Sequence, residues 1–211
     1  MHTHLCSVLL LAALGGPLAA ATVEGTITFT KGTSAGLLAW VPGVTKANVP
    51  PAVIDQKDKI FSPSMIAVRP GATITMRNSD AIQHNAYAND KATAVSFDTG
   101  LNAPSSDTPL KVDWPAGKVV RLGCKIHPAM QVWIASLDTD AWTVPALGAG
   151  AGDSKLATFT VTDVPADATK LGVWTSKFGE VELVLKAGTA VSVTLGTADK
   201  PAGTVQATLK P

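Results

Sequence analysis

The sequence predicts an all-β protein built from two β-sandwiches. Its apolar residues fall in short alternating runs, and Pro, Gly, Asn and Asp separate one run from the next. No stretch of helical length shows a 3.6-residue apolar period. With 211 residues, the chain is long enough for one large domain or two small domains, each with its own core.

Residues 1–21 differ from the rest of the chain and are expected to be a secretory signal peptide. The apolar run 5–14 has about ten residues, which is too short to span a bilayer. A Gly-Gly-Pro sequence ends this run, and small residues suitable for a signal peptidase follow up to Ala21. We therefore expect an exported, periplasmic protein with no membrane span in its mature chain.

The first domain is expected to span residues 22–138. Its predicted strands occupy 23–29, 37–41, 53–56, 59–61, 65–68, 72–77, 94–97, 118–124 and 131–135. Ile74 and Met76 share one face of the strand 72–77, so that face is expected to be buried. The polar stretch 86–113 is expected to contain a single strand.

The composition changes after Leu137. Residues 146–152 are rich in Gly and Ala, which predicts a flexible linker, placed at 139–153. A second β-sandwich is expected over residues 154–211, with strands at 157–162, 170–175, 180–185, 190–195 and 203–209.

The charge balance excludes some classes of partner. Seventeen Lys and Arg oppose 16 Asp and Glu, so the formal net charge is +1. Nucleic acids and anionic membranes select strongly basic surfaces, so neither is an expected partner. The sequence also has no Gly-rich phosphate loop and no Ser/His/Asp arrangement for hydrolysis.

The candidate functional residues are a Cys, two His and a Met. Cys124, His127 and Met130 lie in one loop that follows the predicted strand 118–124, and His84 lies about forty residues upstream. Removal of the signal peptide would leave Cys124 as the one Cys and these two His as the mature chain's full set. An unpaired thiol in an oxidising compartment is either buried or bound to a metal.

This set of donors has a specific chemical meaning. Two imidazoles, a thiolate and a thioether are the ligands of a blue-copper electron-transfer site. Structural zinc prefers four Cys or His ligands, and the expected mature chain offers three and a thioether. Enzymes with several coppers need additional His ligands, which the mature chain lacks, so no enzyme is expected. Taken singly, each residue also has a simpler interpretation as core or surface, and a β-sandwich without metal stays an alternative.

These motifs give the chain a resemblance to the cupredoxins. The loop Cys124–Met130 is similar to that of amicyanin. Residues 50–137 resemble exported plastocyanin-like proteins labelled methylamine-utilisation proteins, on the segments 55–57, 61–63, 68–71, 78–80 and 84–85. The resemblance implies a cupredoxin Greek-key β-sandwich that holds one type 1 copper ion, Cu(I) or Cu(II).

The resemblance also implies roles for individual residues. The equatorial ligands would be His84, Cys124 and His127, and the axial ligand Met130. Asn85 would support the ligand loop near the Cys sulfur by hydrogen bonds. Ala129 departs from the pattern, because those relatives often carry an aromatic residue there. Apart from the resemblance, the five Trp are interpreted as core or rim packing, and the position of Trp133 three residues after Met130 would let it pack under the ligand loop.

The second sandwich has its own resemblance. Segments 159–165 and 171–174 resemble the end of a carboxypeptidase-regulatory-like β-sandwich, and the opening strands 23–29 and 37–41 resemble its beginning. Two arrangements follow. The domains are in simple tandem, or the cupredoxin is inserted in a discontinuous sandwich to which residues 22–43 belong.

The expected function is one-electron transport between redox partners in the periplasm. By resemblance, the partner would dock weakly on an apolar patch made by His127, Pro128 and Ala129, since electron-transfer contacts are small. The near-zero charge predicts a modest effect of salt on docking. The alternative is a periplasmic copper-handling protein without obligatory electron transfer, which would use the same ligands.

Overall fold

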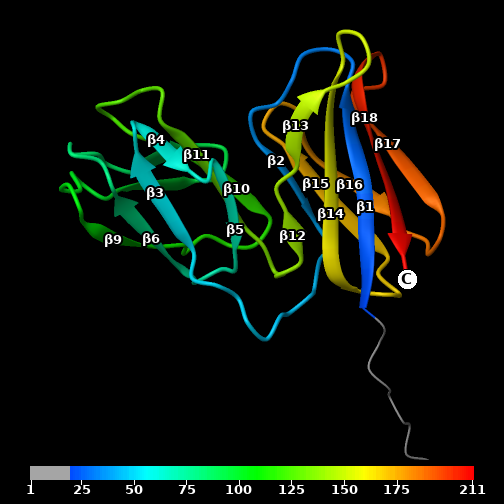
Figure 1. Ribbon diagram of the computed structural model, residues 1–211, viewed down its shortest axis with the longest axis horizontal. Helices are drawn as coiled ribbons and strands as arrows, with labels where there is room; N and C mark the ends of the chain where they lie inside the picture. The colour runs from blue at the N-terminus through cyan, green and yellow to red at the C-terminus, as the bar shows by residue number, and fades with distance from the viewer. Residues whose placement is uncertain (1–19) are drawn as a thin grey trace, which may run out of the picture.

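The computed structural model describes residues 20–211 (Figure 1). Most of the predicted signal peptide, residues 1–19, lies outside the described residues, and Ala20 and Ala21 already belong to the first strand. Every regular element from residue 20 onward is a β-strand, which confirms the all-β prediction. In this part of the chain no helix is long and apolar enough to cross a membrane. Two β units lie side by side in Figure 1.

The first unit, which we call the site unit, contains the strands of the middle of the chain. They are β3 (Val53–Lys57), β4 (Ile60–Ser62), β5 (Met65–Val68), β6 (Thr73–Asn78), β7 (Tyr87–Asp90), β8 (Val95–Asp98), β9 (Asp107–Lys111), β10 (Lys118–Gly123) and β11 (Gln131–Ser136). One sheet has the order β5-β11-β10-β7-β8, and the other has the order β4-β3-β6-β9. The pairs β11–β5 and β3–β6 are parallel, and the remaining pairs are antiparallel.

The core of the site unit is built by the inward faces of these strands. Ile74 and Met76 of β6 are both fully buried, as the alternation of this strand predicts. The same hydrophobic cluster includes Ile54 and Phe61 of the β3–β4 hairpin and Val132 and Ile134 of β11. Cys124 and Met130 belong to this cluster as well, so two of the candidate ligands lie at the edge of a packed core.

The second unit, which we call the terminal unit, combines both ends of the described chain. Its strands are β1 (Ala20–Phe29), β2 (Leu37–Trp40), β12 (Trp142–Thr143), β13 (Ala146–Ala149), β14 (Lys155–Pro165), β15 (Lys170–Thr175), β16 (Gly179–Val184), β17 (Ala190–Thr197) and β18 (Lys200–Lys210). The two sheets have the orders β13-β14-β1-β18-β17 and β12-β2-β15-β16. β1 lies between β14 and β18, and β2 pairs with β15 (Figure 1). The opening strands therefore share their sheets with the C-terminal strands.

Four strands lie where the sequence pattern predicts irregular chain. Residues 139–153, predicted as a linker, contain β12 and β13, which pair with β2 and β14. The polar stretch 86–113 contains β7 and β9 in addition to β8. Strand β9 includes Pro109 and lies at the edge of its sheet, where a residue without an N–H costs no ladder hydrogen bond.

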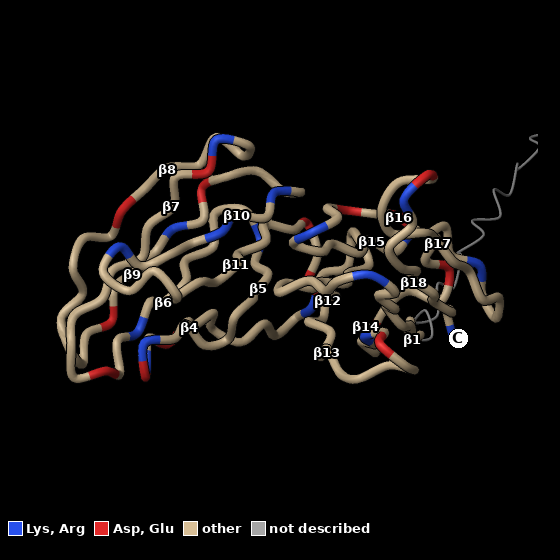
Figure 2. Tube along the Cα trace, turned by 90° about the horizontal axis from the view of Figure 1, so that it is seen from above, with Lys and Arg blue, Asp and Glu red and all other residues tan. Residues whose placement is uncertain are grey.

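An apolar cluster and one arginine join the two units. Leu38 and Trp40 of β2 pack with Met65, Ala67, Ala135 and Leu137 of the site unit. The guanidinium of Arg69 donates to both carboxylate oxygens of Asp140, each at 3.0 Å, and also to the carbonyl of Val44 at 2.9 Å. Charged residues elsewhere are of mixed sign along both units (Figure 2).

Trp133 is also part of this junction, and the prediction that it packs under the ligand loop is wrong. Its ring centroid lies 6.4 Å from that of Trp174 on β15. A Cβ added at Gly36 would lie 3.3 Å from the Trp133 ring, so the indole covers the start of β2. Successive residues of β11 point to opposite faces, and Val132 and Ile134 take the core face.

Candidate metal centre

His84, Cys124 and His127 come together at one point. One ring nitrogen from each His and the Sγ of Cys124 all lie within 4.8 Å of one another. The Nδ1 atoms of the two His are 2.9 Å apart, and Nδ1 of His127 is 3.8 Å from Sγ of Cys124. His84 and His127 are 43 positions apart in the chain. Together with Cys124 they present three possible metal-binding atoms to the same small volume.

The loop that carries His84 is held by buried backbone and side-chain hydrogen bonds. The N–H of His84 donates to the carbonyl of Asn102 at 3.2 Å, and the N–H of Asn102 donates back at 2.6 Å. The fully buried Asn78 donates through Nδ2 to the carbonyls of Ile82, Asn102 and Ala103, at 2.9, 3.0 and 3.0 Å. These contacts fix the backbone on both sides of His84, whose side chain is fully buried.

The other three candidate ligands come from the loop between β10 and β11. Cys124 directly follows β10 and is 2% exposed, and it is the free cysteine of the described residues. The N–H of Met130 donates to the carbonyl of His127 at 2.9 Å, which closes a tight turn before β11 begins. Met130 is fully buried and borders the same surface cavity as Cys124. The β10–β11 hairpin thus fixes both ends of this loop.

Asn85 links the two loops. Its Oδ1 accepts the N–H of Lys125, the residue after Cys124, at 2.8 Å. Its Nδ2 donates to Asp98 at 3.0 Å. The Lys125 ammonium, followed by Asn85 and the N–H of Gly100, lowers the pKa of Asp98 to about 2. Asn85 therefore connects the His84 loop to the residue after Cys124.

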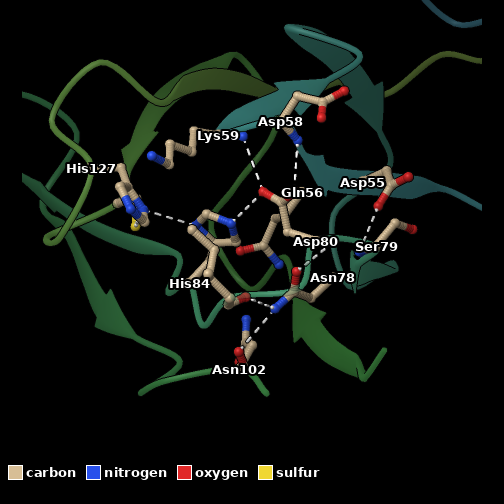
Figure 3. A network of polar contacts seen from close by, with 12 residues as sticks. Asp55, Gln56, Asp58, Lys59, Asn78, Ser79, Asp80, His84, Asn102 and His127 are labelled. Carbon is tan, nitrogen blue, oxygen red and sulfur yellow. Dashed lines mark hydrogen bonds and ion pairs between the residues drawn. The ribbon is translucent and has the colours of Figure 1, made fainter. Parts of the chain in front are cut away.

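Asp80 is a member of the site that the sequence analysis did not assign. Its Oδ2 lies 2.7 Å from Nε2 of His84, on the side of the ring opposite to the Nδ1 that faces His127 (Figure 3). The N–H groups of Asp58 and Lys59 donate to the same carboxylate at 2.9 and 3.0 Å. The Lys59 N–H, then the His84 contact, lower the pKa of Asp80 to about 2, so the group is a carboxylate at neutral pH. The sequence could not reveal this contact, because an Asp four residues before a His also occurs in turns where the two side chains do not meet.

His127 is the more exposed of the two His. Burial, followed by the charges of His84 and Lys59, lowers the pKa of His127, which favours its neutral form. Pro128 and Ala129 beside it are exposed. Several large apolar side chains are also exposed next to the site residues in the chain: Ile60, Ile82, Leu101 and Ile126.

The donor types limit which metals the site suits. Neutral imidazole nitrogen and Cys sulfur together suit copper or zinc. The group of His, Cys and carboxylate donors found in residues 20–211 has three members, one fewer than the four of a structural zinc site. The carboxylate of Asp80 contacts the far nitrogen of His84 and therefore is not a fourth donor to the same point.

Part of this chain is similar to proteins of known structure. No family model matches the chain, and no curated protein matches it. A single-residue variant of amicyanin in its Cu(I) form is 15% identical over 46% of this chain and 97% of that protein, with a TM-score of 0.37. A purple cupredoxin from Nitrosopumilus maritimus is 18% identical over 40% of this chain and 98% of that protein, with a TM-score of 0.35.

A Cu-containing nitrite reductase from Thermus scotoductus SA-01 is also similar to part of the chain. It is 19% identical over 44% of this chain, with a TM-score of 0.36. The match spans 23% of the reductase, so it covers less than a quarter of that protein.

Proposed function

We propose that the chain is a cupredoxin-type protein that binds one copper ion and carries one electron between redox partners. The observation that carries this proposal is the convergence of two imidazole Nδ1 atoms and one thiol at a single point. His84, Cys124 and His127 would hold the ion together with Met130, which is buried beside them in the same loop as Cys124. This donor set is the one found in type 1 copper sites.

The residues fit copper in both of its redox states. Imidazole nitrogen suits Cu(II), and thiolate and thioether suit Cu(I). A lowered pKa favours the neutral, metal-binding form of His127. Cys124 is buried, which protects its sulfur from oxidants in solution.

The chain's own contribution is to hold the ligands in one arrangement. A copper ion bound there supplies the redox couple, by cycling between Cu(I) and Cu(II). Asn78 fixes the His84 loop, Asn85 joins that loop to Lys125, and the β10–β11 hairpin fixes the Cys124 loop. Because these contacts do not depend on the metal's charge, little movement of the protein should accompany electron transfer.

We propose that the redox partner docks where His127 approaches the surface. Pro128, Ala129 and Ile126 of the His127 loop are exposed. Ile82 and Leu101 are exposed too, on the two loops that His84 and Asn102 join by their backbone hydrogen bonds. A small apolar contact suits a partner that binds and leaves quickly. The net charge of +1 predicts that salt has only a modest effect on the rate of electron transfer.

We further propose export to the periplasm and a two-part organisation of the mature chain. Export rests on the apolar segment in residues 1–21. For the organisation, strand pairing supports insertion of the site unit into a sandwich made by both chain ends, because β1 and β2 pair with β14, β15 and β18. The chain would act as a carrier and not as an enzyme.

The test is the optical spectrum of the protein with one equivalent of Cu(II), compared with that of the variant Cys124→Ser. We expect intense thiolate-to-copper charge-transfer absorption in the visible range, and its loss in the variant. Tight copper binding without this absorption would indicate the alternative function, copper handling. If no copper binds at all, the site assignment is wrong.

A further inference from the structure

We propose that Asp80 is the positioning residue of this centre: its carboxylate selects the tautomer of His84 in which Nδ1 carries the metal-binding lone pair. The claim about the tautomer concerns the protein alone. Its consequence for copper rests on the proposed function.

The contact between Asp80 and His84 determines which ring nitrogen of His84 carries the proton. Nε2 of His84 lies 2.7 Å from Oδ2 of Asp80. An ionised carboxylate can only accept hydrogen bonds, so the proton between these atoms belongs to Nε2. A neutral imidazole carries one proton, and Nδ1 of His84 is therefore left with its lone pair, on the side of the ring that faces Nδ1 of His127.

The proton position of His84 also determines that of His127. The Nδ1 atoms of His84 and His127 are 2.9 Å apart, which is hydrogen-bond distance. Because Nδ1 of His84 is the acceptor, Nδ1 of His127 must be the donor when no metal is bound. Asp80 thus determines the proton positions of both rings, although it contacts only one of them.

Asp80 is held by hydrogen bonds to the β3–β4 hairpin. Its carboxylate accepts the N–H groups of Asp58 and Lys59 in the turn between β3 and β4. Its own N–H donates to the carbonyl of Gln56 on β3 at 3.1 Å. The orientation of the His84 ring is therefore tied to the β3–β4 hairpin as well as to its own loop (Figure 3).

The consequence for a bound copper is a preference for its more charged state. A carboxylate on the far nitrogen raises the basicity of a ligating imidazole, and loss of such a partner typically weakens metal binding by about 10–100-fold. If Asp80→Asn weakens Cu(II) binding by that factor and leaves Cu(I) binding unchanged, the reduction potential rises by about 59 mV for each factor of ten.

The experiment uses the full chain and three variants. Asp80→Asn removes the charge but keeps the size, and Asp80→Glu restores a carboxylate. Asp55→Asn is the matched control, because Asp55 accepts the N–H of Ser79 in the same loop and has no hydrogen bond to His84. The first measurement is the tautomer of His84 by ¹⁵N NMR of the imidazole nitrogens before copper is added. The second is the reduction potential with copper bound.

We expect a single Nε2–H tautomer of His84 in the unmodified protein and in Asp55→Asn. Asp80→Asn should lose this preference and raise the potential, and Asp80→Glu should restore part of both. An unchanged tautomer in Asp80→Asn would overturn the proposal, as would an equal change of potential in Asp55→Asn. If copper gives no charge-transfer absorption in any protein, the proposed function fails while the tautomer still decides the role of Asp80.

Discussion

Asn78 is expected to be the residue whose loss most disturbs the loop that carries His84. Its Nδ2 group donates to three carbonyls, and its Oδ1 accepts the N–H of Asp80 at 3.1 Å. Each hydrogen bond contributes about 1 kcal/mol net, and each buried partner left unpaired costs about 1–3 kcal/mol. Since the two protons of Nδ2 are shared among three carbonyls that are not all buried, Asn78→Ala should destabilise the protein by about 2–4 kcal/mol.

Two measurements test this expectation. Thermal unfolding gives the overall loss of stability, and hydrogen exchange of the His84 and Asn102 amides reports the loop itself, since these two residues bond to each other. Asn89→Ala is the control, because Asn89 is exposed on β7. The reasoning is refuted if Asn78→Ala and Asn89→Ala lose similar stability, or if exchange of the two amides is unchanged.

Three further predictions concern the rest of the fold. Arg69→Ala leaves Asp140 in a largely buried position without its ion pair and should cost about 2–4 kcal/mol. Arg77→Ala breaks a half-exposed pair and should lower the melting temperature far less in the same thermal melts. The fold lowers the pKa of Asp98 from 3.8 to about 2 and also lowers that of Asp140 from 3.8, so the stabilisation from both carboxylates is present above the ordinary pKa and is lost as the pH falls through the lowered value. Asp140→Asn should flatten this acid dependence, and an unflattened curve would exclude Asp140 as its source. Deletion of residues 154–211 removes both partners of β1 and removes β15 from beside β2, which keeps only the short β12 as a partner. Hydrogen exchange of β1 should therefore lose its protection and that of β2 should be weakened; retained protection of β1 would argue for a tandem arrangement.

Much of the candidate site could be predicted from the sequence, because the signal there is chemical and local. Cys124, His127 and Met130 share one short loop, so their proximity needs no knowledge of the fold. The alternation of β6 also predicts correctly that Ile74 and Met76 are buried, since strand periodicity is a property of the local chain. The convergence of His84 with this loop required only that two strand ends meet.

The tertiary structure determined the contacts between segments that are distant in the sequence. Strands β7 and β9 are polar and exist because neighbouring strands complete their hydrogen bonds, which outweighs their weak intrinsic preference. Trp133 faces the terminal unit because the core face of β11 is taken by its neighbours.

The candidate ligands could be found from the sequence, whereas Asp80, which contacts one of them, could be found only from the folded chain. The sequence by itself determined the types of donor, the all-β class and the loop that holds three of the four candidates. Only the folded chain shows Asp80 against His84 and β1 between β14 and β18. The physical reason is that a turn Asp or a short apolar strand has the same local pattern whichever partner it meets, and the partner is chosen by long-range packing.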